Sequence, residues 1–181
     1  MTKNLYNRCR QSEIGNGDRQ DQRVRIVEYQ PEHQPSFKRL NQEWITRWFK
    51  MEPADYKSLD HPQEYILDPG GHILIALLKD EPVGTCALIR MNEETYELAK
   101  MSVSAQVREQ GIGLLLGRAA IDKAKRLGAE RLYLESNTVL KPAISLYRKL
   151  GFQEIKGKTS PYERCNIQME ILLKQQDETR S

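Results

Sequence analysis

One stretch of the sequence decides the fold: Val103-Ser104-Ala105-Gln106-Val107-Arg108-Glu109-Gln110-Gly111-Ile112-Gly113-Leu114-Leu115-Leu116. The residues before it form an apolar strand pattern, and those after it form an amphipathic helix pattern. Gly111 and Gly113 have no Cβ, so the backbone N–H groups of this turn are open to an anion, and the helix N-terminus adds partial positive charge. Arg108 supplies a cation beside them. The alternative is a tight turn that merely needs glycines, but the strand, the helix and Arg108 together favour anion binding.

The same glycines also imitate a dinucleotide-binding fingerprint, as Gly111-x-Gly113-x-x-x-Gly117. That fingerprint opens the first βα unit of a doubly wound sheet and needs further βαβ units behind it. Here the turn lies past the middle of the chain, and little more than a single strand–helix unit follows. Hydride transfer to a nicotinamide is therefore the weaker interpretation.

Arg108-x-x-Gly111-x-Gly113 after an apolar strand resembles the acetyl-CoA pyrophosphate loop of the GNAT superfamily of N-acetyltransferases. A second match follows the segment 132–137: Ala143-Ile144-Ser145-Leu146-Tyr147-Arg148-Lys149-Leu150-Gly151-Phe152 is similar to the family's other signature. Both motifs stand in the family's order and near its spacing. The resemblance covers roughly residues 23–173. It implies a mixed α/β (α+β) fold, with a mostly antiparallel sheet of about seven strands, helices on both faces and a splay between the fourth and fifth strands.

The resemblance also implies acetyl-CoA as a cosubstrate and assigns residues to it. The backbone of Met101, Ser102 and Val103 would hold the pantetheine arm, and a nearby N–H would polarise the thioester carbonyl. Many relatives place an asparagine seven residues before the signature tyrosine, where this chain has Leu140, so Asn137 is the candidate substitute. The pyrophosphate would lie on the turn made by Arg108, Glu109, Gln110, Gly111, Ile112 and Gly113.

The strand that leads into the turn breaks its own alternation. Tyr96 and Leu98 belong to one face of a period-2 pattern, whereas Met101 and Val103 belong to the other. A β-bulge near residues 99–100 would produce this shift, and a strand buried on both faces would also give mixed phasing.

Two side chains are candidates for catalysis by resemblance to the family. An amine acceptor is protonated near neutral pH and must lose a proton before it attacks. Glu97 is the candidate base, because several GNAT acetyltransferases carry a glutamate at this offset from the strand valine. Tyr147 occupies the family's tyrosine position and is the candidate acid for the departing thiolate, as well as a cofactor contact. The alternative for Glu97 is an exposed strand glutamate without a catalytic role, and the alternative for Tyr147 is a tyrosine that only packs in the core.

Around these motifs the sequence predicts a single domain at 23–173, flanked by a flexible polar arm at 1–22 and a polar tail at 174–181. Ser36 is a plausible N-cap for the first helix, and Gly128 and Gly151 are expected to end two later helices. Strands are expected at 23–29, 72–79, 83–91, 96–104, 131–136, 152–156 and 166–173, and helices at 36–50, 53–59, 112–127 and 142–150.

Composition narrows the function classes. The net charge is only +3, from 28 basic and 25 acidic residues that are scattered, so nothing indicates a nucleic acid partner. No apolar run approaches a membrane span. Cys9, Cys86 and Cys165 lack metal-type spacing and indicate free thiols in a reducing, cytoplasmic compartment. With the histidines isolated as well, we expect no metal.

The sequence therefore predicts an enzyme that moves an acetyl group from acetyl-CoA to a primary amine of a small molecule or peptide. A non-catalytic module of the same shape, which senses acyl-CoA or binds a partner, is the alternative. Residues 36–67 and 157–165 are expected to shape the acceptor pocket. In the second segment, Lys158 or Arg164 could bind a carboxylate of the acceptor. The alternative is that each is a solvated charge on a loop. The terminal strands could also pair two copies into a homodimer.

Overall fold

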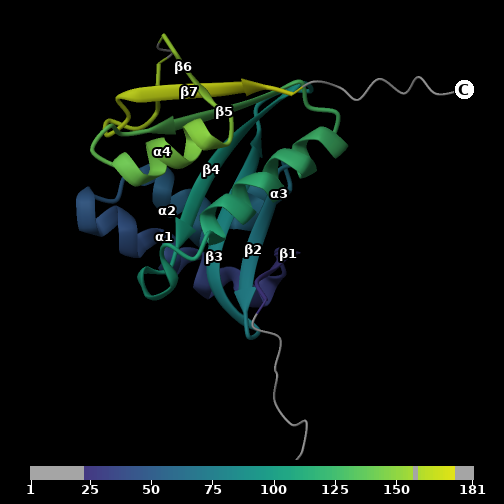
Figure 1. Ribbon diagram of the computed structural model, residues 1–181, viewed down its shortest axis with the longest axis vertical. Coiled ribbons are helices and arrows are strands. Elements are labelled where there is room, and N and C mark those ends of the chain that lie inside the picture. Colours follow the sequence, from purple (N-terminus) through teal and green to yellow (C-terminus); the bar gives the residue numbers. More distant parts are fainter. Residues whose placement is uncertain (1–22, 157–158, 174–181) are drawn as a thin grey trace, which may run out of the picture.

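The computed structural model describes residues 23–156 and 159–173, and structural statements below concern these residues. They form one seven-stranded sheet in the order β1-β2-β3-β4-β5-β7-β6, flanked by helices (Figure 1). The strands are β1 (Arg25–Glu28), β2 (His72–Leu78), β3 (Glu81–Arg90), β4 (Thr95–Val103), β5 (Arg131–Ser136), β6 (Gln153–Ile155) and β7 (Ile167–Leu172). The main helices are α1 (Gln34–Trp48), α2 (Pro53–Asp60), α3 (Ile112–Arg126) and α4 (Lys141–Lys149), with short turns η1 (Pro31–His33), η2 (Gln63–Leu67) and η3 (Ala105–Val107).

The sheet is mixed, as predicted. Five of its pairings are antiparallel, and β4 and β5 are parallel. The long connection between β4 and β5 contains α3, which gives the strand–helix–strand unit that the glycine turn indicates. The doubly wound parallel sheet of the dinucleotide-binding interpretation is therefore wrong.

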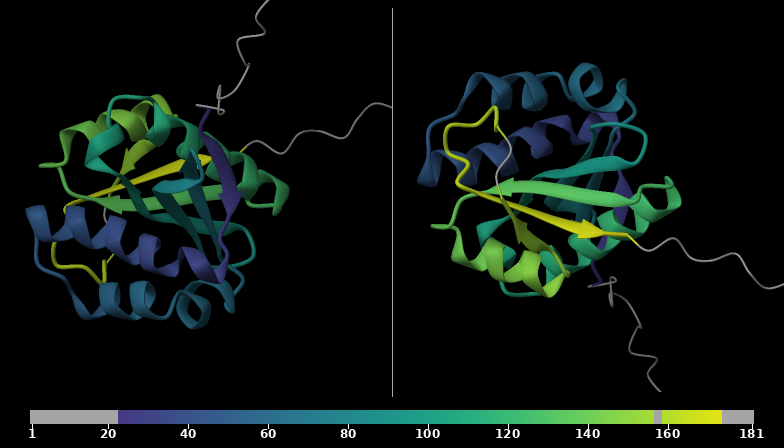
Figure 2. Two further views of the ribbon diagram at one scale, coloured as in Figure 1. Left: turned by 90° about the horizontal axis from the view of Figure 1, so that it is seen from below. Right: turned by 90° about the horizontal axis from the view of Figure 1, so that it is seen from above.

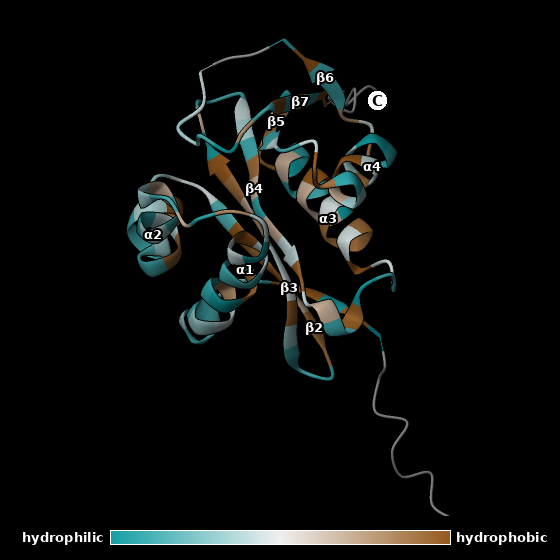
Figure 3. Cartoon of the chain, turned by 90° about the vertical axis from the view of Figure 1, so that its left-hand side faces the viewer, coloured by the Kyte–Doolittle hydropathy of each residue, from teal (hydrophilic) through white to brown (hydrophobic). Residues whose placement is uncertain are grey.

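The helices cover both faces of the sheet and create two separate apolar cores (Figures 2 and 3). On one face α1 and α2 bury Phe37, Ile45 and Leu59 against apolar side chains of β2 and β3. On the other face α3 and α4 bury Leu116, Ile144 and other side chains against β2 to β5 and β7. The sheet therefore separates the two cores.

The predicted bulge lies in β4. The register between β3 and β4 shifts between Thr85 and Ala87, and Lys100 adopts a left-handed backbone with φ 50°. Tyr96 and Leu98 before the bulge, and Met101 and Val103 after it, all pack into the core beneath α3 and α4. The extra residue reverses the alternation, which is why these side chains share one face despite their different phases in the sequence.

The bulge coincides with the predicted splay between β4 and β5. Their pairing runs from Thr95 with Arg131 to Glu97 with Tyr133 and includes no later residue. β5 continues to Ser136, paired with β7 on its other side. The second half of β4 therefore has no strand beside it on the β5 side.

Local corrections concern the chain outside the sheet. The first helix begins at Gln34, so Ser36 lies within its first turn and does not cap it. The reason is η1, whose Pro31 starts the helical path earlier, and Pro35 is tolerated in the first turn. The predicted arm at 1–22 and tail at 174–181 lie outside the described residues. Within the described part of the chain, no helix has both the length and the apolarity needed to cross a membrane.

Helix α3 offers a direct test of this packing. Leu116 is 0% exposed and Leu115 is 43% exposed, so neighbouring leucines of one helix differ in burial. Leu116→Ala should lower the free energy of unfolding by about 2–5 kcal/mol, because it leaves a cavity under α3. The matched control Leu115→Ala should cost less than about 1 kcal/mol in the same urea titration. Equal unfolding midpoints for the two variants would contradict the packing described here.

Candidate active site

The turn before α3 presents a helix N-terminus without a protein cap. Gly111 is the N-cap residue, with φ 77° and no side chain to bond the first helical N–H groups. A Cβ built on Gly111 meets nothing within 4 Å, so the space above the turn is open. Glu109 is also left-handed, and the segment 108–111 is exposed. An exposed helix N-terminus with free N–H groups is a suitable place for a phosphate oxygen.

Gly113 also has a packing role, while its contact with a cofactor stays a prediction. A Cβ at this position would lie 3.1 Å from Leu146 Cδ2, so the missing side chain allows α3 to pack closely on α4. Gly111 therefore supplies the backbone conformation, and Gly113 supplies the helix contact. Ile112, between them, is 1% exposed and anchors the start of α3 in the core.

The backbone of the second half of β4 faces the splay. Ser104 N donates to Val83 O of β3 at 2.8 Å. Because peptide groups alternate along a strand, the N–H groups of Met101 and Val103 point away from β3, towards the side where β5 no longer pairs. The side chain of Ser102 takes another direction and donates to Leu40 O of α1 at 2.7 Å. Residues 101 and 103 therefore offer an unpaired strand edge inside the protein.

Glu97 lies at the last paired position of β4 beside β5, on the face covered by α1 and α2. It is opposite Ile89, which packs into the core on that face, and next to Tyr133 of β5. Burial, followed by the nearby charge of Glu135, raises the pKa of Glu97 to about 7, while Lys100 acts in the opposite direction. No described residue donates a hydrogen bond to this carboxyl group. Glu97 therefore titrates near neutral pH at the mouth of the splay.

Tyr147 lies on the other face of the sheet. It is 9% exposed, belongs to the core beneath α3 and α4, and packs edge-on against Phe152 at 6.1 Å between ring centroids. Burial, with a further contribution from Cys86, raises the pKa of Tyr147 to about 12. Its hydroxyl makes no hydrogen bond to another described residue. A tyrosine with this pKa keeps its proton at neutral pH and can act only as a donor of it.

Asn137 is held by contacts within the protein. Its side-chain amide donates to Arg164 O at 2.6 Å, and its carbonyl oxygen accepts from Val139 N at 2.9 Å. These bonds shape the connection from β5 to α4, whose N-cap position is Leu140. A contact from Asn137 to a cofactor stays a prediction.

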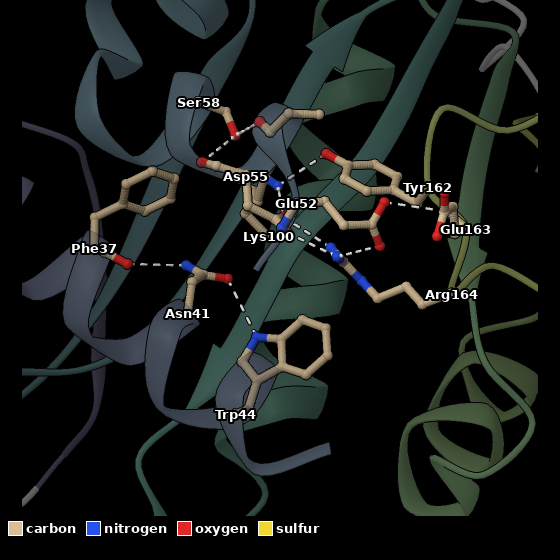
Figure 4. A network of polar contacts seen from close by, with 11 residues as sticks. Phe37, Asn41, Trp44, Glu52, Asp55, Ser58, Lys100, Tyr162, Glu163 and Arg164 are labelled. Atoms are coloured by element: carbon tan, nitrogen blue, oxygen red, sulfur yellow. Dashed lines mark hydrogen bonds and ion pairs between the residues drawn. The ribbon is translucent and has the colours of Figure 1, made fainter. Parts of the chain in front are cut away.

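A cluster of charged groups on the α1 and α2 face was missed by the sequence analysis (Figure 4). We call it the Asp55 cluster, made of Glu52, Asp55, Lys100, Tyr162 and Arg164. Asp55 is 0% exposed. Its carboxylate accepts a hydrogen bond from Lys100 Nζ at 2.9 Å and one from each of the two terminal nitrogens of Arg164, Nη1 and Nη2, at 2.7 Å. Arg164 also donates to Glu52 at 2.9 Å. The cluster ties α2, the bulge of β4 and the segment before β7 together.

The Asp55 cluster corrects the expectation for Arg164. Its guanidinium is neither a solvated loop charge nor free to read an acceptor carboxylate, because it is paired with two carboxylates. Lys158 lies outside the described residues. Glu52 and Asp55 form a capping box at the start of α2, and this Glu-x-x-Asp spacing before a helix was the available sequence signal.

Glu135 is a second site residue that was missed. It follows Tyr133 on the same face of β5 as Glu97 on β4, while Leu132 and Leu134 face the opposite core. The carboxyl group of Glu135 accepts hydrogen bonds from Tyr133 Oη at 2.8 Å, Ser160 Oγ at 2.5 Å and Gln168 Nε2 at 3.3 Å. The alternation Leu-Tyr-Leu-Glu of β5 was the signal for its orientation.

Residues 37–152 match the model of the acetyltransferase (GNAT) family. The chain belongs to this family. It is 32% identical over 101 residues to the uncharacterized N-acetyltransferase YjgM of Escherichia coli, a match that covers 54% of this chain and 60% of that protein. The matched part of the chain thus spans less than two thirds of the length of this relative.

Solved structures share the GNAT fold. An acetyltransferase of the GNAT family from Staphylococcus aureus matches with a TM-score of 0.77 and 24% identity, over 84% of this chain and 100% of that one. A Bacillus subtilis acetyltransferase in complex with CoA matches with a TM-score of 0.64 and 22% identity, over 83% and 99%.

The Asp55 cluster predicts a specific response to acid. Although burial works to raise the pKa of Asp55, Arg164 and Lys100 outweigh it and hold the pKa below its ordinary value of 3.8. Asp55 therefore contributes stability in full above that value, and this stability is lost as the pH falls through the lower pKa of the folded state.

Asp55→Asn should cost about 3–5 kcal/mol of unfolding free energy at pH 7, because Lys100 remains buried without its counter-charge. The difference from the wild type should shrink in urea titrations below pH 3.8. Asp122→Asn, on the exposed face of α3, is the control and should unfold like the wild type at both pH values. A difference that is independent of pH would show that Asp55 acts by shape and not by charge.

Proposed function

We propose that the protein is an acetyl-CoA-dependent N-acetyltransferase that acts on a primary amine of a small molecule or peptide. The observation that carries the proposal is the unpaired edge at Met101 and Val103, which opens between a helix N-terminus on one face of the sheet and Glu97 on the other. Such an opening joins two compartments that the two cores otherwise keep apart. One compartment would hold the acyl donor, and the other would hold the amine.

The residues around the turn fit the proposed cosubstrate. Free N–H groups at the start of α3 suit the pyrophosphate, with Arg108 exposed beside them, and the N–H groups of residues 101 and 103 suit the amides of the pantetheine arm. Bound acetyl-CoA would supply an activated acetyl thioester. A backbone N–H of β4 that faces the splay would polarise the thioester carbonyl as negative charge develops on its oxygen.

The two candidate catalytic groups have suitable proton states for direct transfer. With a pKa of about 7, Glu97 is ionised in a large fraction of molecules at neutral pH and can accept a proton from the ammonium of the acceptor. Tyr147 retains its proton and can give it to the departing thiolate. The two groups lie on opposite faces of the sheet, which suits separate donor and acceptor sides.

Two further expectations belong to this proposal. Cys86 and Cys165 are free thiols among the described residues, which suits the reducing cytoplasm. β6 forms one edge of the sheet, where a strand of a second copy could pair with it. A homodimer through the terminal strands stays a prediction.

Release of CoA thiol from acetyl-CoA across a panel of amines tests the function. The panel should include amino acids, diamines and short peptides with free N-termini. We expect acetyl-CoA consumption that depends on an amine. A protein that binds CoA in calorimetry but releases no thiol with any amine would support the alternative of a non-catalytic acyl-CoA sensor.

The role of Glu97 predicts a particular pH profile. Wild-type kcat/KM should rise as the pH increases through about 7, where Glu97 loses its proton. Glu97→Gln should lack this rise and recover activity at higher pH, since an alkylamine becomes neutral near pH 10 without a base. A variant with the wild-type profile would assign the base to another group, with neighbouring Glu135 the first to examine.

The role of Tyr147 predicts a loss of turnover without a loss of binding. Tyr147→Phe keeps the buried ring and removes a hydroxyl that has no partner among the described residues. Turnover should fall by about 10- to 10⁴-fold, the range for one acid–base group, while CoA affinity and melting temperature stay unchanged. Leu172→Ala, at a side chain that is 66% exposed and lies at the far end of β7 from the splay, is the control. Unchanged turnover in Tyr147→Phe would remove this residue from the mechanism.

A further inference from the structure

Glu135 is a carboxylate that the protein fixes with neutral hydrogen-bond donors. One of its oxygens accepts from Tyr133 Oη at 2.8 Å and Gln168 Nε2 at 3.3 Å, and the other accepts from Ser160 Oγ at 2.5 Å. Among the described residues, no lysine, arginine or histidine forms an ion pair with it. Hydroxyl and amide donors stabilise an ionised carboxylate without cancelling its charge. Glu135 is therefore a half-buried negative charge in a fixed position.

This charge lies beside the candidate base. Glu97 of β4 is the register partner of Tyr133 of β5, and Glu135 follows Tyr133 by two residues on the same face of the sheet. Positions related in this way on neighbouring strands are roughly 7–8 Å apart. Tyr133 links the two, because it stands beside Glu97 in the register and donates its hydroxyl to Glu135. The charge of Glu135 consequently acts on Glu97 and raises its pKa.

Two groups of charges around these glutamates are balanced internally. The Asp55 cluster contains two carboxylates and two cations that are joined by ion pairs (Figure 4). On β7, Glu170 stands opposite Tyr133 and pairs with Arg131. Neither Glu97 nor Glu135 has an ion-pair partner among the described residues. The described side chains beside the splay on this face thus carry an excess of negative charge, which attracts a cation and repels an anion.

We propose that Glu135 determines the class of acceptor: its fixed charge draws an ammonium towards Glu97 and repels an acceptor that has a carboxylate on the carbon bearing the amine. This inference rests on the proposed acetyltransferase function. The selected acceptors are amines without that acid group, and free α-amino acids are disfavoured. The effect is a matter of charge at a distance, so it needs no movement of the protein and no direct bond from Glu135 to the acceptor.

The same charge affects the proton of Glu97 in the free enzyme. Glu135 raises the pKa of Glu97, whereas Lys100 lowers it. Removal of the charge of Glu135 should therefore lower the pKa of Glu97 and, at the same time, weaken the attraction for an amine. A residue that only supports the fold would not produce both changes. The titratable or charged side chains around the two glutamates are Asp55 from α2, Lys100 from β4, Tyr133 from β5, and Tyr162 and Cys165 from the segment before β7.

The first test uses the wild-type protein and matched pairs of acceptors. Each pair is an α-amino acid and the amine that remains after its decarboxylation: leucine with isopentylamine, lysine with cadaverine, and phenylalanine with phenethylamine. In CoA-thiol release at about pH 8, kcat/KM should favour the amine of the best pair by about 10-fold or more, because like charges repel. A free α-amino acid as the best acceptor would overturn the proposal. Failure of the proposed function is a different result, in which no acceptor releases CoA.

The second test is Glu135→Gln, which keeps the length of the side chain and removes its charge. For the best amine, kcat/KM at about pH 8 should fall by about 10-fold, and the rising limb of the pH profile should move to lower pH. For the matching α-amino acid, kcat/KM should fall by less than about 2-fold, since its two charges respond in opposite directions.

The control is Glu154→Gln. Glu154 is exposed on β6 and stands opposite Met169, which packs into the core on the other face of the sheet. This variant should leave both substrates and the pH profile unchanged. In Glu135→Gln, an unchanged preference for the amine, or a rising limb that moves to higher pH, would overturn the proposal. A rising limb that disappears would overturn it as well, because Glu135 would then be the base. If Glu135→Gln does not fold, the wild-type comparison of matched acceptors decides.

Discussion

The structure depends on one irregular residue in its central strand. Lys100 adopts a left-handed backbone, which a non-glycine residue adopts only when its surroundings compensate the strain. The compensation is visible: its ammonium is paired with buried Asp55 and bonded to Tyr162. The bulge made by this residue keeps the apolar side chains of β4 in one core and ends the pairing with β5. A single backbone feature thus coincides with the opening of the sheet and anchors the Asp55 cluster.

The opening divides the chemistry between the two faces of the sheet. On the α3 and α4 face lie the N-terminus of α3, which has no side-chain cap, and the buried, protonated hydroxyl of Tyr147. On the α1 and α2 face, Glu97 titrates near neutrality, beside the Lys100–Asp55 pair and the hydrogen bond from Tyr133 to Glu135. Because each layer has its own core, the two halves of the site can be rigid separately and still meet at the splay.

Much of this could be predicted from sequence, because the relevant signals are local. The turn at Gly111, the signature around Tyr147 and the broken alternation of β4 each lie within a short segment. The Asp55 cluster could not be predicted, since Lys100 and Arg164 lie 45 and 109 residues from Asp55 along the chain. The packing role of Gly113 could not be predicted for a related reason: its partner Leu146 belongs to another helix, and only the fold brings them together. Ser36 failed as a cap because the helical path already begins at η1.

The central claim is that the edge of β4 at Met101 and Val103 is unpaired in the free protein and is completed by the cosubstrate. Amide hydrogen exchange at single-residue resolution, with and without CoA, measures this directly. We expect the amides of residues 101 and 103 to exchange rapidly in the free protein and to slow on addition of CoA, while Ser104, bonded to Val83, is protected in both states. Strong protection of residues 101 and 103 without CoA, or exchange that CoA does not alter, would contradict the account.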